Sequence, residues 1–448
     1  MRFEASSVSL AELAADVPNA LGAGPFGSNL ISRDYTASGV PVIRGQNLAG
    51  RWVGGEFVYV SDQKAAQLRK NTARPGDIVF TQRGTLGQVS IVPDVPFPLY
   101  VVSQSQMKLT VDVRKADPRF VYYACTAADF VGQVHNNAVA AGVPHINLGI
   151  LRGLRVPLPP MQMQVEAADF LSLVDDRIDL LRKTNSTLES IAQALFKSWF
   201  VDFDPVRAKA EGREPEGIDA ATEALFPAEF AESELGLVPR GWQASAIRDV
   251  VEGVYDGPHA TPPEASAGPV FLGIKNLTGT SLDLSEIRHV DEQDWERWTR
   301  RITPTANDIV FSYEAALGLF ALVPPHLRCC LGRRLALVRA KARDGTPHFW
   351  FHQFVAQPFQ HLLVKHTVLG ATVNRIALKE FPSYKVLNPP TVVRTAFEQA
   401  AAPLWARIHA NGQLVQVLTG LRDTLLPRLI SGKLRVPEIQ NHLEEVAA

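Results

Sequence analysis

The amino-acid sequence repeats itself, and this repeat limits the fold more than any other feature. At an offset of about 230 residues, GVPVIRGQNL (39–48) matches GPVFLGIKNL (268–277), and VPLPP (156–160) matches VLNPP (386–390). Between them, GDIVFTQRGTLGQVSIVP (76–93) matches NDIVFSYEAALGLFALVP (307–324) without a gap. Blocks that keep their order indicate a duplication, so each half is expected to fold into the same kind of unit.

Each half shows the same order of local patterns. Short β-type runs broken by Gly and Pro come first, such as VPVIRG and DIVFTQRG in the first half. An aromatic-rich stretch follows, PRFVYYACTAADF or PHFWFHQFVAQPF, and favours a buried helix. A Pro-Pro stop then precedes a long stretch with helical periodicity. The pattern predicts an α+β fold.

The two long stretches carry heptad repeats with one apolar seam. The seam positions are Val174, Ile178, Leu181, Asn185, Leu188, Ala192, Leu195 and Trp199 in the first, and Leu404, Ile408, Asn411, Val415, Leu418, Arg422, Leu425 and Leu429 in the second. Such a seam is typical of a coiled coil. The alternative is two amphipathic helices that pack on their own domains. A helix from Gln162 to Val201 would extend roughly 60 Å, which favours the coiled coil because one small domain needs less.

An antiparallel helix pair related by a pseudo-twofold axis would place Asn185 opposite Asn411 and Leu181 opposite Val415. A buried Asn pair lowers stability but defines the register of the two helices. We therefore expect the pair to act as a spacer of defined length.

These patterns divide the chain into two repeated α/β domains joined by two long antiparallel helices, with internal pseudo-twofold symmetry. The expected segments are a first domain at 1–160, a spacer helix at 161–204, an acidic connector at 205–240, a second domain at 241–390, a second spacer helix at 391–436 and a tail at 437–448.

Composition excludes several classes of protein. Hydrophobic residues make up 46% and charged residues 20% of the chain, as in soluble globular proteins. No apolar stretch approaches the roughly 18 residues of a membrane span, and the N-terminus lacks a signal core, so a cytoplasmic location is expected. The net charge is −1, but residues 161–243 hold 8 Lys and Arg against 16 Asp and Glu between two mildly basic blocks. Basic blocks can meet phosphates; ordinary surface variation is the alternative.

Motifs for catalysis are weak. GAGPFG (22–27) has the spacing of a dinucleotide loop but follows no strand pattern, and a turn is the simpler interpretation. Asn388, Pro389 and Pro390 resemble the Asn-Pro-Pro-aromatic motif of amino-methyltransferases, but Thr391 replaces the aromatic residue. The three cysteines and the scattered histidines lack metal-ligand spacing. No catalytic or metal site is predicted.

Recognition loops are the remaining signal. TQRGTLGQ (81–88), SQSQ (103–106), HNN (135–137) and CLGRR (330–334) are rich in side chains that suit base edges. Arg pairs with guanine, and Gln or Asn pairs with adenine. Each loop alone could be solvated surface, but corresponding loops on two domains with a rigid spacer suit a two-part DNA site.

The chain resembles, over nearly its whole length, the specificity subunit of type I restriction–modification systems. The matching blocks are GPFGSNL (24–30), GVPVIRGQNL (39–48), RPGDIVFTQRGTLGQVSIVP (74–93), SQSQMKL (103–109), IAQALFKSWFVDFDPVRAKAEG (191–212), LGLVPRGW (235–242) and LRDTLLPRLISGKLRV (421–436). The block at 191–212 is the most specific of them.

The resemblance implies a non-catalytic adaptor that binds no cofactor itself. Each domain would read half of a bipartite site in double-stranded DNA. The two helices would dock two methyltransferase subunits, which use S-adenosylmethionine and methylate adenine at N6. Two restriction subunits, dependent on ATP and Mg, join in restricting systems. The alternatives are a fused modification or restriction enzyme and a scaffold with degenerate DNA loops.

Candidate site residues follow from these loops and blocks. The candidate DNA contacts are Phe26, Ser28, Asn29, Arg44, Asn47, Gln82, Arg83, Gln104, Gln106 and Asn136 in the first half, and His259, Thr261, Lys275, Asn276, Tyr313, Arg333 and Arg334 in the second. The spacer and docking candidates are Asn185, Leu188, Phe196, Trp199, Phe200, Asn411, Leu418 and Leu425. The aromatic cluster that ends with Phe203 would anchor a partner or, alternatively, pack internally. Because Arg83 aligns with Glu314, the two half-sites are expected to differ.

Overall fold

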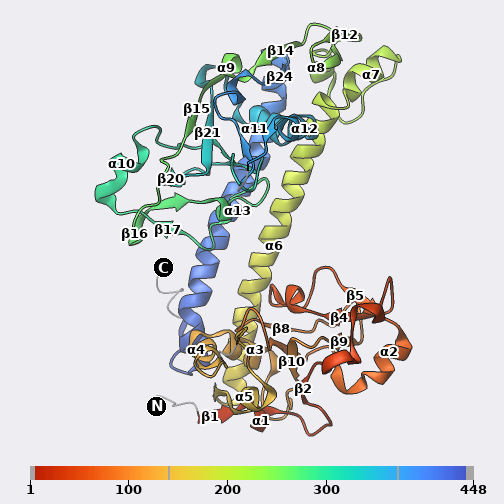
Figure 1. The fold of residues 1–448 in the computed structure, drawn as a ribbon, viewed down its shortest axis with the longest axis vertical. Coiled ribbons are helices and arrows are strands. Elements are labelled where there is room, and N and C mark those ends of the chain that lie inside the picture. The colour runs from red at the N-terminus through yellow and green to blue at the C-terminus, as the bar shows by residue number, and fades with distance from the viewer. Residues whose placement is uncertain (1–5, 140–141, 371–372, 440–448) are drawn as a thin grey trace. The chain divides into compact units, whose positions relative to one another are not determined.

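The computed structural model describes residues 6–139, 142–370 and 373–439, which form two compact units (Figure 1). Unit 1 comprises residues 1–179 and 417–448, and unit 2 comprises residues 180–416. Two helices of 40 residues, α6 (Met161–Phe200) and α13 (Thr391–Ile430), each contribute one part to each unit. Both begin directly after a Pro-Pro pair, at 159–160 and 389–390, as the repeat predicts.

The two long helices pack together as an antiparallel pair. In unit 2, the Asn411 amide donates to Oδ1 of Asn185 at 2.8 Å, and the Asn185 amide donates to the Ile408 carbonyl at 3.1 Å. In unit 1, Arg422 donates to Asp175 at 2.8 Å. Residue numbers rise along one helix as they fall along the other, so the predicted direction and the Asn185–Asn411 pairing are confirmed. Direct contact between Leu181 and Val415 stays a prediction.

Breaking the asparagine pair tests its role in the register. Asn411→Leu should lower the free energy of unfolding by about 1–2 kcal/mol, because the Asn185 amide oxygen loses its donor. Adding Asn185→Leu should recover part of that loss, since both polar groups are then gone. Chemical denaturation of the two single variants and the double variant measures the coupling. Additive losses would contradict it.

Unit 1 contains two sheets beside its part of the helix pair. A four-stranded sheet has the order β2 (Leu21–Ala23), β10 (Gln106–Leu109), β7 (Ile78–Thr81), β8 (Val89–Ile91). A five-stranded sheet has the order β3 (Tyr35–Thr36), β5 (Val58–Val60), β4 (Val40–Ile43), β9 (Tyr100–Val102), β6 (Thr72–Ala73). Strand β1 (Ser6–Ser9) pairs with β11 (Arg155–Leu158), and the helices are α1 (Leu10–Leu13), α2 (Asp62–Gln67), α3 (Pro118–Thr126), α4 (Ala128–Asn136) and α5 (Leu148–Gly153).

Unit 2 repeats this plan. Its four-stranded sheet has the order β15 (Val251–Asp256), β21 (Leu335–Ala340), β18 (Ile309–Ser312), β19 (Phe320–Leu322), and a three-stranded sheet has the order β17 (Arg288–His289), β16 (Ala265–Leu272), β20 (Cys329–Leu331). Strand β14 (Gln243–Ala246) pairs with β24 (Lys385–Asn388), and β22 (Thr367–Val368) pairs with β23 (Arg375–Ile376). The helices are α9 (Ile247–Val250), α10 (Trp295–Thr299), α11 (Pro347–Val355) and α12 (Gln357–Lys365).

The repeated aspartates show why matching sequences give matching sheets. Asp77 precedes β7 and accepts from Lys108 of β10 at 2.9 Å, while Asp308 precedes β18 and accepts from Arg339 of β21 at 2.8 Å. Both carboxylates are buried. Each ion pair joins two neighbouring strands of its four-stranded sheet at the equivalent place, so the duplicated Asp keeps the same strand pairing in both units.

The aromatic-rich stretches form the predicted buried helices, but each makes two helices instead of one. The chain is extended at Ala127 between α3 and α4 and at Ala356 between α11 and α12. The connector also differs from the prediction. Besides α7 (Asp204–Ala210) and α8 (Ala220–Glu223) it forms the hairpin β12 (Phe230–Ser233) and β13 (Gly236–Pro239). Its Val206, Phe226 and Val238 are buried in the core of unit 2.

Candidate nucleic-acid interface

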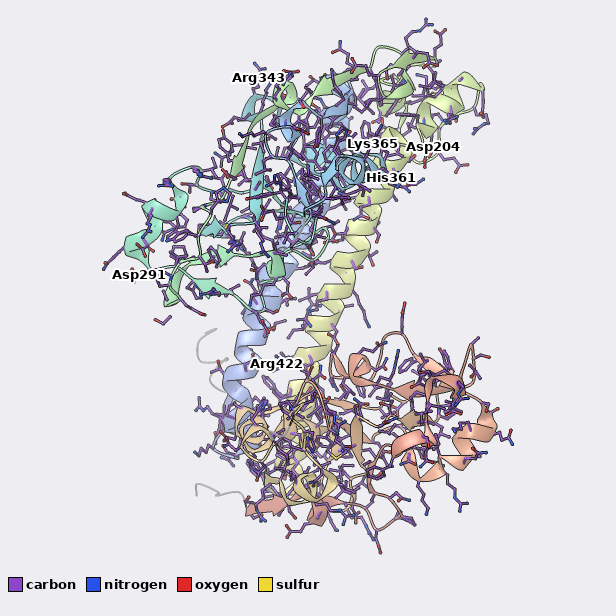
Figure 2. All side chains as sticks on the ribbon, in the orientation of Figure 1. Asp204, Asp291, Arg343, His361, Lys365 and Arg422 are labelled. Atoms are coloured by element: carbon purple, nitrogen blue, oxygen red, sulfur yellow. The ribbon has the colours of Figure 1, made fainter. Side chains whose placement is uncertain are left out.

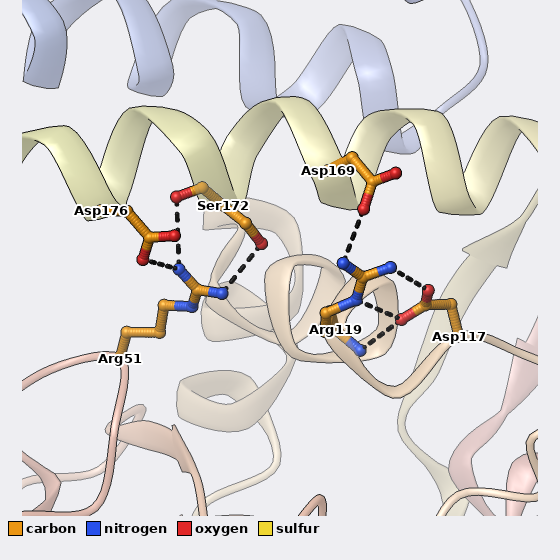
Figure 3. A network of polar contacts seen from close by, with 6 residues as sticks. All are labelled: Arg51, Asp117, Arg119, Asp169, Ser172 and Asp176. Atoms are coloured by element: carbon orange, nitrogen blue, oxygen red, sulfur yellow. Dashed lines mark hydrogen bonds and ion pairs between the residues drawn. The ribbon is translucent and has the colours of Figure 1, made fainter. Parts of the chain in front are cut away.

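Arg51 ties the loops of unit 1 to α6 (Figure 3). Its guanidinium donates to the Ser172 carbonyl at 3.3 Å, to the Ser172 hydroxyl at 2.9 Å and to the Asp176 carboxylate at 2.9 Å. The group also lies 4.7 Å from the centre of the Trp52 ring. Because several bonds converge on a nearly buried side chain, this loop has a defined position on the helix.

Arg119 makes a second link to α6, from the start of α3 (Figure 3). It donates to Asp117 at 2.8 Å and to Asp169 of α6 at 2.6 Å. The hydrogen bond with Asp117 is the main reason that the pKa of Arg119 lies above its usual value. Asp117 also caps α3 by accepting from the Arg119 backbone N–H at 2.7 Å. The sheets of unit 1 are therefore held to the helix through two arginines.

A buried tyrosine adds a third link within unit 1. The Tyr123 hydroxyl of α3 donates to Asp175 at 2.8 Å, and Asp175 also accepts from Arg422, which is labelled on α13 in Figure 2. Burial raises the pKa of Tyr123, so the hydroxyl keeps its proton as the donor. In unit 2 the contact with α6 differs. Thr280, which corresponds to Arg51 in the repeat, donates to Glu189 at 3.0 Å, and burial raises the pKa of Glu189.

The segment Ser103–Gln106 is the centre of a loop cluster in unit 1. The Gln82 N–H donates to the Ser105 carbonyl at 2.7 Å, and the Gly24 N–H donates to the Gln106 carbonyl at 3.0 Å. The Ser103 N–H donates to the Ile43 carbonyl at 3.0 Å, and the Ile146 N–H donates to the Gln82 backbone carbonyl at 3.0 Å. Loops that are far apart in sequence thus meet at one end of the strands of the four-stranded sheet.

Several predicted contacts are exposed on this cluster. Phe26 is 79% exposed, and Ser28, Asn29, Arg83 and Gln104 are exposed as well. The Gln104 amide donates to the carbonyls of Gly27, at 3.3 Å, and Leu30, at 3.0 Å, and so holds the turn. A side chain at Gly24 would place its Cβ 1.8 Å from the Ser103 carbonyl oxygen, so only glycine fits there.

Unit 2 forms the equivalent cluster around residues 332–334. The Gly257 N–H donates to the Leu335 carbonyl at 3.0 Å. The Tyr313 N–H donates to the Arg334 carbonyl at 3.2 Å, and the Ile376 N–H donates to the Tyr313 carbonyl at 2.8 Å. Leu335 pairs with Ser312 as Gln106 pairs with Thr81. The same loops therefore meet at the same end of the four-stranded sheet in both repeats.

The second cluster is rich in ionisable side chains. His259 lies 2.9 Å from Asp256, which also pairs with Arg301. Arg334 lies 3.8 Å from Glu314. Arg333 and Thr261 are exposed. The corresponding places in unit 1 carry Phe26, Arg83 and Gln104, so the two clusters present different chemistry.

Four predicted DNA contacts are corrected by the structure. Asn47, Gln106, Asn276 and Tyr313 are buried. The Tyr313 hydroxyl donates to the Arg333 carbonyl at 2.8 Å, and burial raises its pKa to about 12. Gln106 accepts from the Ser103 hydroxyl. These buried side chains make hydrogen bonds within the loops.

The two asparagines make the same set of bonds in both repeats. Asn47 accepts from the Arg44 N–H at 2.9 Å and donates to the carbonyls of Gly54 and Glu56 at 2.9 Å each. Asn276 accepts from the Gly273 N–H at 2.9 Å and donates to the backbone carbonyls of Asp283 and Glu286. An Asn kept at the same position of both halves was a signal of this structural role.

The remaining candidate DNA contacts stay predictions. Arg44 and Gln82 are half-buried, and Asn136 is exposed at the end of α4. Lys275 is exposed but lies 3.3 Å from Glu286, so a neighbouring carboxylate already offsets its charge. Arg301, Arg375 and His145 join the clusters through tertiary pairing alone, for example by the bridge between Glu314 and Arg375, and sequence reasoning missed them.

The predicted aromatic docking anchors pack internally. Phe196, Trp199 and Phe200 are each at most 4% exposed and belong to the core of unit 2. Phe200 lies 5.0 Å from the ring of Phe349 and 5.5 Å from that of Phe397. The alternative of internal packing therefore holds. The exposed apolar residues of α6 are instead Met161, Val165, Leu173, Leu180 and Ile191.

Metal-binding clusters and membrane-spanning helices are absent from the described residues, 6–139, 142–370 and 373–439. Among them, no group of three or more His, Cys, Asp or Glu is placed to hold a metal ion. In the same part of the chain, no helix is long and apolar enough to cross a membrane.

Comparison with known proteins finds relatives of one kind. Residues 30–190 match the family model of the type I restriction modification DNA specificity domain. The type I restriction enzyme MjaIX specificity subunit of Methanocaldococcus jannaschii is 23% identical, with 91% of this chain and 89% of the relative covered. The HindI specificity subunit of Haemophilus influenzae is 24% identical, with 91% and 97% covered.

A solved structure shows the same fold. The crystal structure of the type I restriction-modification system S subunit from M. genitalium has a TM-score of 0.54 at 15% identity, with 95% of this chain and 96% of that chain covered. The chain is therefore similar to type I restriction–modification specificity subunits over most of its length.

Proposed function

We propose that each loop cluster reads one half of a bipartite site in duplex DNA and that this chain itself catalyses no step. One observation carries the proposal. Both repeats bring the same loops to the same end of the four-stranded sheet, but the side chains there differ. Arg83 and Gln104 are exposed in one cluster, whereas in the other Arg333 is exposed and Glu314 is half-buried. A backbone frame shared by the two repeats, with different polar side chains on it, suits two readers of different base sequences. The proposed reading domains are residues 1–160 and 241–390.

The long helices are proposed to dock two methyltransferase subunits. On α6, Leu173, Leu180 and Ile191 are exposed and share one face at helical spacing. On α13, Leu414, Val417 and Leu421 do the same. In the proposed complex the methyltransferase subunits supply S-adenosylmethionine chemistry at adenine N6, and restriction subunits with ATP and Mg join for cleavage. The proposed setting is the cytoplasm, where the DNA lies.

The function is tested by sequencing adenine methylation in DNA from cells that express this chain with a cognate methyltransferase subunit. The expected result is an asymmetric two-part motif that disappears when this chain is omitted. A motif that persists without the chain would contradict the proposal, and so would an assembled complex that methylates no specific site.

Arg83→Ala should relax the methylated motif at one half-site only. Arg83 is exposed at the end of β7, and loss of a bidentate contact to guanine costs about 1–3 kcal/mol of discrimination. The measurement is the base frequency at each position of the motif, with binding to mismatched duplexes as a second readout.

Arg83→Lys is the matched control, because it keeps the positive charge but cannot make the bidentate contact. It should retain most of the overall affinity while losing the discrimination. If Arg83→Ala weakens reading of both half-sites equally, Arg83 is a general phosphate contact and not a reader.

A further inference from the structure

Each unit carries a short hairpin with exposed apolar side chains beside its loop cluster. In unit 1, Val139 bridges with His145 through backbone hydrogen bonds of 2.9 and 3.3 Å, and Val143, between them in sequence, is 57% exposed. In unit 2, β22 pairs with β23, and Leu369, next to β22, is 81% exposed. Val139 and Leu369 lie at an offset of 230 in the repeat. Both are exposed, so the two units present an apolar side chain at the same position of the repeat, which suits contact with a ligand.

Both hairpins are continuous with the proposed DNA-reading loops. In unit 1, His145 bridges with Arg83, and the Ile146 N–H donates to the Gln82 carbonyl at 3.0 Å. In unit 2, Arg375 bridges with Glu314, and the Ile376 N–H donates to the Tyr313 carbonyl at 2.8 Å. The return strand of each hairpin is therefore paired to the strand end that leads into the loop cluster.

Cationic or ionisable basic side chains flank both hairpins. His135 lies in the last turn of α4, shortly before Val139, and His145 follows Val143. Lys365 is the last residue of α12, labelled in Figure 2, and Arg375 stands in β23. Apolar side chains between basic ones suit duplex DNA, because the basic groups meet phosphates while the apolar groups meet thymine methyls or base faces.

We propose that the exposed apolar residues of the two hairpins, Val139 and Val143 in unit 1 and Val368 and Leu369 in unit 2, contact base pairs of the two half-sites. The inference rests on the proposed function and adds a second, apolar mode of reading to the polar loops. It assigns specificity to residues that the polar pattern of the sequence does not mark.

The test uses the complex of this chain with its methyltransferase subunit, on duplexes that contain the methylated motif. The variants are Val139→Thr with Val143→Thr, and Val368→Thr with Leu369→Asn. Each should raise the dissociation constant about tenfold, the scale of one lost apolar contact, and only while its own half-site is intact. Val113→Thr and Leu237→Asn, at exposed apolar positions away from residues 139–145 and 367–376, are the controls and should bind like the unaltered complex.

Two arms separate the forms of contact. Replacing thymine by uracil in the half-site should reproduce the loss if the side chains meet methyl groups, and 2-aminopurine fluorescence should rise on binding if they unstack a base step. Binding equal to that of the controls overturns the inference. Loss of the methyltransferase subunit with unchanged DNA affinity also overturns it, by making the hairpins protein contacts. If the complex with the unaltered chain methylates DNA without preferring any motif, the proposed function and this inference are overturned together.

Discussion

Replacing Phe200 by alanine should lower the free energy of unfolding of the isolated chain by about 3–5 kcal/mol. The ring is 4% exposed and packs against Trp242, Phe349 and Phe397 in the core of unit 2. Removing it leaves a cavity among rings that cannot all move inward. Chemical denaturation of the chain without partner subunits measures the loss. An unchanged midpoint would contradict internal packing and restore the docking role.

Ile191→Ala is the matched control on the same helix. Ile191 is 49% exposed, so its removal should change the stability of the isolated chain by less than about 0.5 kcal/mol. If the exposed face of α6 docks a methyltransferase subunit, the same variant should weaken assembly of the complex. The two variants thus separate packing from docking, since each should affect only one measurement.

Leu188→Pro should abolish assembly with the methyltransferase subunits. Position 188 lies inside α6, one turn from Asn185, and its side chain packs against the core of unit 2. Proline removes a backbone hydrogen bond and clashes with the preceding turn, at a cost of about 3 kcal/mol or more. The bend falls where the two helices are paired through Asn185 and Asn411. Co-purification and analytical ultracentrifugation measure the assembly.

Leu188→Ala separates the backbone effect from the side chain. It removes part of the packing but leaves a good helix former, so the complex should still form. A normal complex with Leu188→Pro would refute the rigid spacer. Loss of the complex with both variants would mean that the Leu188 side chain, and not the straight helix, is required.

The repeat in the sequence was sufficient to predict the duplicated architecture. The Pro-Pro pairs and the heptads predicted both long helices, and Asn185 with Asn411 predicted their register. These features depend on short-range geometry, because helical period and proline sterics act within a few residues. Local pattern therefore carries such information even in a single sequence.

Local pattern could not tell which polar residues face outward. Asn47 and Tyr313 resemble recognition residues in sequence, but their partners are loop carbonyls that only folding brings near. No sequence motif marks Arg301 or Arg375 as a site residue. They reach the second cluster through contacts with Gly257 and Glu314.

The same limit explains the aromatic cluster. An apolar surface on a helix looks identical in sequence whether it meets a partner or its own domain, and only the presence of Phe349 and Phe397 around Phe200 decided the matter. The sequence by itself determined the repeat, the helices and their register, since these follow from spacing along the chain. The tertiary structure alone decided the direction of each loop side chain, because burial and hydrogen bonding depend on residues distant in sequence.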